Sequence, residues 1–337
     1  SAAAERFLAA IQAPFRIDGH VVSVSLSLGI AVFPADGADP DTLIRKADAA
    51  MYHAKEAGRN AYRFFTERMN HDSAEHLKLR TDMRRGVDAH EFVLHYQPQI
   101  DRARGAIVGV EALIRWPHPE FGLIPPARFI PLAETCGTIV PIGEWVLREA
   151  CRQAAAWDAQ GLPPLVMAVN LSAVQFRRGD LEATVERALA ESGLAPERLE
   201  LELTESILLQ DTAHMLQLVQ RLKALGVKLS IDDFGTGYSS LAYLRQLAVD
   251  KLKIDQSFVR DMTHNPGNAS IVRAVAQMAR NLHLRTIAEG VENAPVLDLL
   301  RAYGCDEAQG YFFARPMDAA ACADFVRRGL SPDRLGA

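Results

Sequence analysis

The chain has 337 residues, of which 49% are hydrophobic, and it carries a formal net charge of −5. A chain of this length can bury a substantial core, and we expect one large domain with a smaller companion. The mildly acidic balance does not favour generic binding to nucleic-acid polymers or to anionic membranes. No apolar run approaches the roughly 18–20 residues that a membrane-spanning helix needs.

The cysteines and the first residues indicate the compartment. Cys136, Cys151, Cys305 and Cys322 are scattered without CxxC spacing, which indicates free thiols in a reducing environment, not a disulfide framework or a zinc ribbon. The sequence opens at Ser-Ala-Ala-Ala-Glu-Arg, without Met, and shows no signal peptide. We therefore expect a cytoplasmic piece of a longer protein, which leaves room for a sensor or membrane anchor upstream.

The first 65 residues differ from the rest in their sequence pattern. Val22–Phe33 alternates and is rich in β-branched residues, which predicts a strand. Asp41–Ala57 has a helical pattern, with Asp41 as its expected N-cap. A polar, helix-prone stretch then predicts a linker helix over 66–90.

From Phe92 onward, strand and helix patterns alternate, which predicts an α/β domain over 91–330. The pattern favours a closed (β/α)8 barrel, a variant of the TIM barrel; an open doubly wound sheet is the alternative. The first two strands are joined by only Asp101–Ala106, too short for a parallel crossover, so this pair should be antiparallel. The predicted strands are 92–100, 107–115, 165–171, 199–205, 227–232, 251–255, 285–289 and 307–313. The predicted helices are 138–160, 181–192, 212–225, 239–247, 268–282, 294–303 and 317–328.

Two adjacent carboxylates, Asp232 and Asp233, end the apolar run Val227–Ile231 and precede a glycine-rich turn. Two like charges side by side repel each other, so a strand end that carries both is destabilised unless a cation lies between them. A divalent metal is the simplest such cation.

Polar side chains also end the other predicted barrel strands. Because functional residues of such barrels lie at the C-terminal ends of the parallel strands, we expect these side chains to meet at one rim. Every residue of this set except one lysine offers an oxygen ligand, and none is His or Cys. Such a set favours Mg²⁺ or Mn²⁺ over zinc and fits a two-metal site. The residues are Glu111, Asn170, Glu202, Glu205, Asp232, Asp233, Lys253, Glu289, Glu292 and Gln309.

Each of these residues, taken singly, has a simpler explanation. A carboxylate at a strand end often caps the next helix, and a charged residue in a strand pattern is often an exposed one. Asp232 or Asp233 could cap a helix near Ser239, Glu202 could be an exposed strand residue, and Asn170 could bond to the backbone in a turn. Lys253 could lie on the surface or pair with Asp255. Glu289 could pair with Arg285, and Arg115 could lie on a solvated face. Taken together they require many coincidences at the same end of successive strands.

The ordered series of motifs from about Leu79 to Leu330 resembles the EAL domain family of cyclic di-GMP phosphodiesterases. A lone Glu-Ala-Leu tripeptide has little weight, but the whole series is specific. The matching segments are Tyr96-Gln97-Pro98, Glu111-Ala112-Leu113, Pro125–Glu134, Asn170, Glu202 and Glu205, the Asp-Asp-Phe-Gly-Thr-Gly run from Asp232, Lys253, Glu289 and Glu292, and Gln309-Gly310-Tyr311.

The resemblance implies a modified TIM barrel that cleaves one phosphodiester of cyclic di-GMP to give linear pGpG with two Mg²⁺ or Mn²⁺ ions. It implies a homodimer that meets through the loop around 233–245. Glu111, Asn170, Glu202 and Asp232 would hold the first metal, with Asp232 bridging and Asp233 on the second. Glu289 would be the general base or second-metal partner, Lys253 would hold the nucleophilic water, and Glu205 would brace the 233–240 loop. Gln97, Leu113, Arg115 and Pro125 would contact substrate, with Gln309 and Glu292 supporting them. Two alternatives remain, a non-catalytic cyclic di-GMP receptor and an unrelated Mg²⁺ phosphoesterase.

Residues 1–65 resemble the C-terminal part of a GGDEF (diguanylate cyclase) domain, through Val22–Gly29 and the Ala47–Asn60 helix pattern. The Gly-Gly-Asp/Glu-Glu-Phe turn that defines that family does not occur in this chain. Lys55 and Arg59 match triphosphate-contacting positions, but half a site should not make cyclic di-GMP. The remnant should expose an apolar face, and we expect it to pack against a partner, another copy or the barrel.

Overall fold

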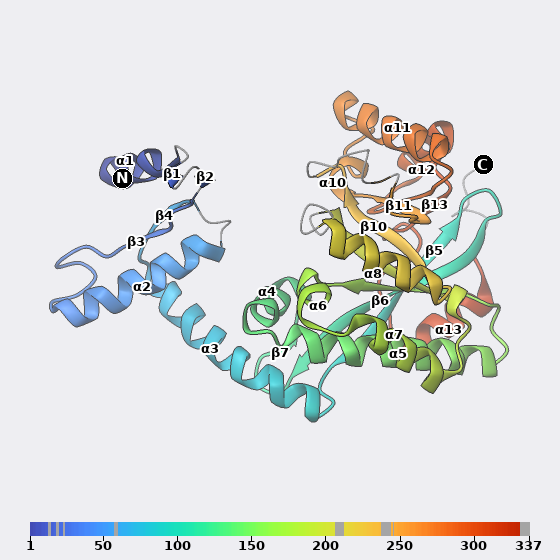
Figure 1. Cartoon of the computed structure of the whole chain (residues 1–337), viewed down its shortest axis with the longest axis horizontal. Helices are drawn as coiled ribbons and strands as arrows, with labels where there is room; N and C mark the ends of the chain where they lie inside the picture. The colour runs from blue at the N-terminus through green and yellow to red at the C-terminus, as the bar shows by residue number, and fades with distance from the viewer. Residues whose placement is uncertain are drawn as a thin grey trace. The chain divides into compact units, whose positions relative to one another are not determined.

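The computed structural model describes residues 1–12, 15–17, 20–22, 24–56, 60–205, 212–236, 244 and 246–330. The chain divides into two compact units, Ser1–Asp82 and Met83–Ala337. Helix α3 (Glu67–Asp88) runs from the first unit into the second (Figure 1). No helix in the described part of the chain is long and apolar enough to cross a membrane.

The N-terminal unit holds two small sheets and two helices of its own, α1 (Ala2–Gln12) and α2 (Pro40–Glu56). The strands are β1 (Phe15–Ile17) antiparallel to β2 (His20–Val22), and β3 (Leu28–Ile30) parallel to β4 (Tyr62–Phe64). The single strand predicted over Val22–Phe33 is therefore wrong, because its residues are shared between β2 and β3. The predicted cap is also corrected: Asp39, not Asp41, accepts the hydrogen bond from the Thr42 N–H at 2.8 Å.

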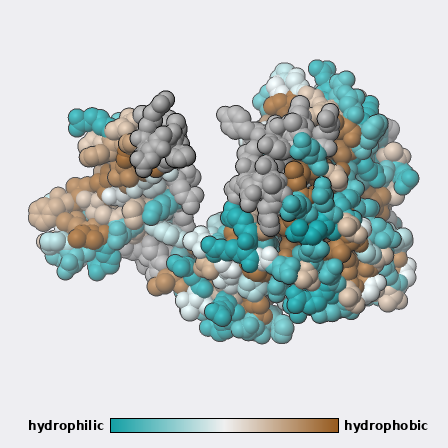
Figure 2. Space-filling model, viewed as in Figure 1, coloured by the Kyte–Doolittle hydropathy of each residue, from teal (hydrophilic) through white to brown (hydrophobic). Residues whose placement is uncertain are grey.

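The N-terminal unit has a small core and exposes large apolar side chains. Its core is built on Ala49, Ala50 and Phe65. Figure 2 shows apolar side chains on the surface of this unit, where Phe7 and Phe33 are 61% and 66% exposed. The expectation that this segment packs against the barrel or another chain stays a prediction.

The second unit is a closed barrel of eight strands. They are β5 (Val93–Asp101), β6 (Ala106–His118), β8 (Val166–Leu171), β9 (Leu199–Thr204), β10 (Lys228–Phe234), β11 (Lys251–Ile254), β12 (Arg285–Ala288) and β13 (Glu307–Ala308). Their order is β5-β13-β12-β11-β10-β9-β8-β6, and β5 pairs again with β6 to close the barrel. Strand β5 is antiparallel to both neighbours, and the remaining pairs are parallel. The closed barrel with a reversed first strand is confirmed, and the open sheet is excluded.

Short side-chain hydrogen bonds begin several of the surrounding helices. Asp180, Asn265, Asn293 and Asp318 each accept a backbone N–H of the first helical turn, as expected of N-caps. The helices are α4 (Pro126–Cys136), α5 (Ile139–Ala159), α6 (Ala173–Arg178), α7 (Leu181–Ser192), α8 (Thr212–Ala224), α10 (Gln256–Val259), α11 (Pro266–Asn281), α12 (Ala294–Tyr303) and α13 (Ala319–Arg328). A short strand β7 (Gly122–Ile124) pairs with the end of β6, and a 3-10 turn covers Pro196–Arg198.

Helix α4 is not among the predicted helices, although a proline in the first turn, here Pro126, suits a helix. The strand predicted over 307–313 ends at Ala308, because from Gly310 the chain turns and the Phe313 N–H donates to the Gly310 carbonyl. The helix predicted over 239–247 lies largely outside the described residues.

The interior of the barrel is charged, whereas TIM barrels are usually filled by aliphatic side chains. Lys251 on β11 contacts Glu200 on β9 at 2.9 Å and Glu307 on β13 at 2.8 Å, and all three side chains are buried. These strands are not neighbours, so the ion pairs cross the interior. Alternate residues such as Leu201 and Leu252 are fully buried and point the other way, toward the helices.

We predict that Lys251→Met lowers the free energy of unfolding by about 3–5 kcal/mol, because it leaves the buried carboxylate of Glu200 without its cation and leaves Glu307 with Arg285 alone. Urea denaturation measures the change. Lys228→Met, at a half-buried lysine on β10, is the control and should change stability by no more than about 0.5 kcal/mol. Adding Glu200→Gln and Glu307→Gln to Lys251→Met should recover most of the loss. If Lys251→Met is as stable as the wild type, the assignment of Lys251 as the cation of these buried carboxylates is contradicted.

Candidate functional site

The polar residues predicted from the strand ends do meet at one end of the barrel. Glu111 lies on β6, Glu202 on β9, Asp232 on β10 and Lys253 on β11, while Glu289 follows β12 directly. Because consecutive strands of the barrel present their C-terminal ends to the same rim, residues 51 to 198 positions apart come into hydrogen-bond contact there.

Lys253 lies at the centre of this cluster and is fully buried. Its Nζ is 2.7 Å from an oxygen of Glu202 and 2.7 Å from one of Glu289. Asp232 follows at 3.1 Å and Glu111 at 3.6 Å. Burial alone would lower the pKa of Lys253, but these four carboxylates raise it well above its ordinary value. The side chain is therefore a permanent cation, and it is neither on the surface nor paired with Asp255 alone.

Two amides hold the carboxylate of Glu111 from either side. Asn170 Nδ2 donates to Glu111 Oε1 at 2.6 Å, and Gln309 Nε2 donates to Oε2 at 2.5 Å. Gln309 also donates to Gln97 Oε1 at 3.1 Å, and Gln97 in turn donates to the backbone carbonyl of Ala314. Burial opposes ionisation of Glu111, but Lys253 and these amide donors lower its pKa below the ordinary value.

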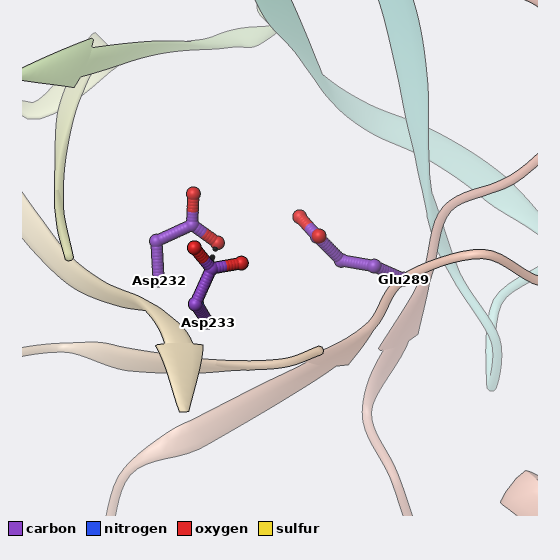
Figure 3. A group of neighbouring side chains, drawn as sticks. All are labelled: Asp232, Asp233 and Glu289. Carbon is purple, nitrogen blue, oxygen red and sulfur yellow. Dashed lines mark hydrogen bonds between the residues drawn. The ribbon is translucent and has the colours of Figure 1, made fainter. Parts of the chain in front are cut away.

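Three carboxylates, Asp232, Asp233 and Glu289, have oxygens within 4.8 Å of one another, and Figure 3 shows them converging on one space. Adjacent strand residues normally point to opposite faces. Here the pairing of β10 with β11 shifts register between Ile231 and Phe234, and Asp233 has a left-handed φ of 54°. This bulge brings both aspartates to the rim, and the Asp233 N–H donates to Asp232 Oδ1 at 3.0 Å.

Negative charge is in excess at this rim. Burial raises the pKa of Glu289 to about 8, and the carboxylates of Asp232 and Glu111 add to the shift. Burial also raises the pKa of Asp233 to about 6, with the charge of Asp232 as the next cause. Burial likewise raises the pKa of Glu202 well above its usual range. One ammonium does not balance so many carboxylates, so the site favours a further cation.

The donor set fits a hard divalent ion. Carboxylate and amide oxygens are the ligands that Mg²⁺ and Mn²⁺ prefer, and no His or Cys takes part in the cluster formed by the described residues. The buried Oε1 of Glu202 makes no hydrogen bond within the described part of the chain, so it remains available as a ligand.

Glu205 lies beside the cluster and contacts the turn that follows Asp233. Its Oε2 accepts a hydrogen bond from the Gly235 N–H at 2.9 Å, and the side chain is buried. This contact fits the expected brace at the start of the 233–240 loop. Residues 237–243, which include the second half of that loop, lie outside the described part of the chain.

A cavity of about 230 Å³ opens above the carboxylates. Five of the residues predicted for substrate contact line it, namely Gln97, Leu113, Arg115, Glu292 and Gln309. The sixth, Pro125, does not; it precedes α4, and the adjacent Pro126 lines a separate apolar cavity of about 410 Å³.

Sequence reasoning missed several residues of this rim. Arg260 forms an ion pair with Glu292 at 3.0 Å, and Tyr311 lies under the guanidinium of Arg315 at 4.6 Å. Gln256 and Arg260 lie on or beside the four-residue helix α10, which gives no periodic signal. Asp255 follows the end of β11 and caps α10, and its contact with Asp233 was not predicted.

The comparisons with known proteins agree with this geometry. The family model of the EAL domain matches residues 80–316. The chain belongs to the EAL domain family. The model of the diguanylate cyclase GGDEF domain matches residues 1–61, so a partial GGDEF segment precedes the EAL domain.

Two curated relatives are similar along nearly the whole chain. The bifunctional diguanylate cyclase/cyclic di-GMP phosphodiesterase MucR of Pseudomonas aeruginosa is 46% identical over 94% of this chain and 46% of its own length. The cyclic di-GMP phosphodiesterase PdeR of Escherichia coli is 43% identical over 98% of this chain and 50% of its own length. A solved structure described as the PaMucR phosphodiesterase in complex with c-di-GMP has a TM-score of 0.70 at 46% identity, covering 73% of this chain and 99% of that one. The chain spans about half the length of the curated relatives it matches.

We predict that the stability of the chelator-treated protein falls with rising pH through Glu289. Its folded pKa of about 8 lies above the ordinary value of 4.5, so between these values the folded state binds more protons than the unfolded state. The contribution of Glu289 to the free energy of unfolding should therefore fall as pH rises from about 4.5 to about 8 and level off above that. Urea denaturation of the wild type and of Glu289→Gln isolates this contribution as their difference. If the free energy of unfolding of the wild type instead rises relative to that of Glu289→Gln over this pH range, the excess of negative charge at the rim is contradicted.

Proposed function

We propose that the EAL domain hydrolyses cyclic di-GMP to linear pGpG in a metal-dependent reaction. Relatives that carry the name of cyclic di-GMP phosphodiesterase are similar over nearly the whole chain, and a similar solved domain is described as a c-di-GMP complex. The observation that carries the proposal is the set of carboxylates that converge on Lys253 at the rim, together with the two amides that hold Glu111.

The proposal assigns the metal ligands by residue. Glu111, Asn170, Glu202 and Asp232 would hold one ion, and Asp232, Asp233 and Glu289 a second. The proximity of the oxygens in the second group supports this division. When bound, Mg²⁺ or Mn²⁺ would lower the pKa of a water and offset the charge of the phosphodiester.

The residues of the chain supply the remaining chemistry. The fixed charge of Lys253 stabilises negative charge that develops on the phosphoryl oxygens, and it is most effective because the site is buried. Glu289 borders the cavity, so its carboxylate, when ionised, can accept the proton of the attacking water. Asn170 and Gln309 keep the carboxylate of Glu111 in one orientation.

Arg115 is the best candidate for holding the anionic substrate. It lines the cavity above the carboxylates and is half-buried, with Nη1 donating to the carbonyl of Ile114 at 2.8 Å. A guanidinium that is already ordered loses less conformational entropy on binding a phosphate. The substrate approaches an acidic rim, so such a cation also offsets repulsion.

Assembly and regulation belong to this proposal as expectations. A homodimer through the loop around 233–245 remains a proposal that rests on the family, since most of that loop lies outside the described residues. The partial GGDEF segment is proposed to modulate the barrel through α3, which joins the two units.

We expect Glu111→Gln and Asp232→Asn each to lower turnover by at least about a thousandfold, because each removes a ligand charge where the reaction needs a metal. The assay incubates the full chain with cyclic di-GMP, with and without Mn²⁺, and separates the products. Glu186→Gln, at an exposed position of α7, is the matched control and should behave as the wild type. Binding of cyclic di-GMP without pGpG in the wild type would favour the receptor alternative, and undiminished turnover in the variants would refute the ligand assignment.

We expect Arg115→Met to raise KM about ten- to a hundredfold with a smaller effect on kcat, because the lost contact is made to substrate and transition state alike. Steady-state kinetics on cyclic di-GMP measure both constants. Arg260→Met, at the exposed end of the same cavity, should have a smaller effect because its guanidinium is already paired with Glu292. A change confined to kcat would assign Arg115 to the chemical step instead.

A further inference from the structure

We propose that Lys253 is an exchangeable cation of the site. Its ammonium holds the ligand carboxylates together within the folded barrel, and it gives up part of these ion pairs when a divalent ion binds. The inference rests on the metal dependence proposed above but concerns the lysine itself. It predicts that the lysine and the metal compete for the same carboxylates.

The contacts of Lys253 are the first support. Its Nζ contacts one oxygen each of Glu111, Glu202, Asp232 and Glu289, at 2.7–3.6 Å. All four belong to the proposed metal ligands. An ion held by these carboxylates would lie close to the ammonium unless the lysine moved.

The lysine does not contact every oxygen of these carboxylates. Glu202 directs Oε2 to Nζ, whereas its buried Oε1 has no hydrogen-bond partner within the described residues. A buried oxygen without a donor is destabilising, so Glu202 is prepared for a partner other than Lys253. The flexible stem of a lysine allows its ammonium to shift while the strand stays in place.

The charges explain why the fold needs the lysine. Four carboxylates gathered in a buried site repel one another and would protonate or move apart without a cation among them. Lys253 is fully buried and contacts all four, and it lies on β11 between Leu252 and Ile254, which are fully buried as well. The lysine can therefore keep the ligands in place before any metal arrives.

Lys251 provides an internal comparison. It is also a buried lysine on β11, two residues earlier, and its partners are Glu200 and Glu307. Neither partner belongs to the proposed ligands. Replacing either lysine by Met removes a buried cation of the same size from the same strand, but only Lys253 shares its carboxylates with the metal.

The test compares the wild type, Lys253→Met, Lys253→Arg and Lys251→Met as full chains. Thermal unfolding is followed after chelator treatment and again with increasing Mn²⁺, and calorimetric titration gives the Mn²⁺ affinity. Both Met variants should melt below the wild type in chelator. Mn²⁺ should raise the melting temperature of Lys253→Met more than that of the wild type, with a Kd about tenfold lower, because a competing cation has been removed. Lys251→Met should show the wild-type Mn²⁺ shift and affinity, and Lys253→Arg should stay near the wild type in chelator.

The outcomes separate this inference from the proposed function. If Mn²⁺ does not stabilise the wild type, the metal-dependent function fails. If Mn²⁺ stabilises the wild type but stabilises Lys253→Met equally or less, the exchange fails. A Lys253→Met protein that folds only with Mn²⁺ and unfolds on chelation supports the exchange, and one that does not fold even in Mn²⁺ overturns it.

Discussion

Two of the four ion pairs of Lys253 join strands that are not neighbours in the sheet, and the other two reach the ends of its neighbours β10 and β12. Lys253 on β11 reaches Glu202 on β9 and Glu111 on β6 across the interior. In most barrels of this kind, aliphatic layers fill that space. Here the charged side chains of the site also form the core of the barrel at its rim. Stability and ligand geometry therefore rest on the same side chains.

A local irregularity makes the convergence possible. A regular strand would send Asp232 and Asp233 to opposite faces, and only one would reach the rim. The register shift before Phe234 and the left-handed backbone of Asp233 place both carboxylates at the rim with Glu289. A non-glycine residue in that conformation costs about 1 kcal/mol or more, which the surrounding hydrogen bonds must offset. The strain lies at the point where the chemistry needs two adjacent acids.

Much of this site could be predicted from the sequence, because a parallel barrel brings all its strand ends to one rim. Glu111, Glu202 and Asp232 needed only correct strand assignments. Lys253 was harder, since its partners lie 21 to 142 residues away and no local pattern shows that it is buried among them. Local conformation was missed where it depends on packing. One example is α4, which starts at a Pro-Pro pair. Another is the strand that begins at Glu307 and ends early. Gly310 packs against the backbone of Val291 there, so closely that a Cβ on Gly310 would lie 2.2 Å from the Val291 carbonyl oxygen.

The two charged layers of the barrel differ in balance, and this difference shows which of them can take up a cation. In the lower layer, Lys251 and Arg285 face Glu200, Glu307 and Asp101, so two cations serve three acids. At the rim, Lys253 alone serves Glu111, Glu202, Asp232 and Glu289, with Asp233 close by. A near-balanced buried network is a structural core, whereas a large excess of carboxylates is maintained only where another cation is expected. Burial raises the pKa of both Glu289 and Asp233, and the neighbouring carboxylates add to the shift, so each carboxyl holds its proton more tightly than it would in water. A divalent ion would take the place of those protons, so the same imbalance that weakens the fold provides the driving force for metal binding.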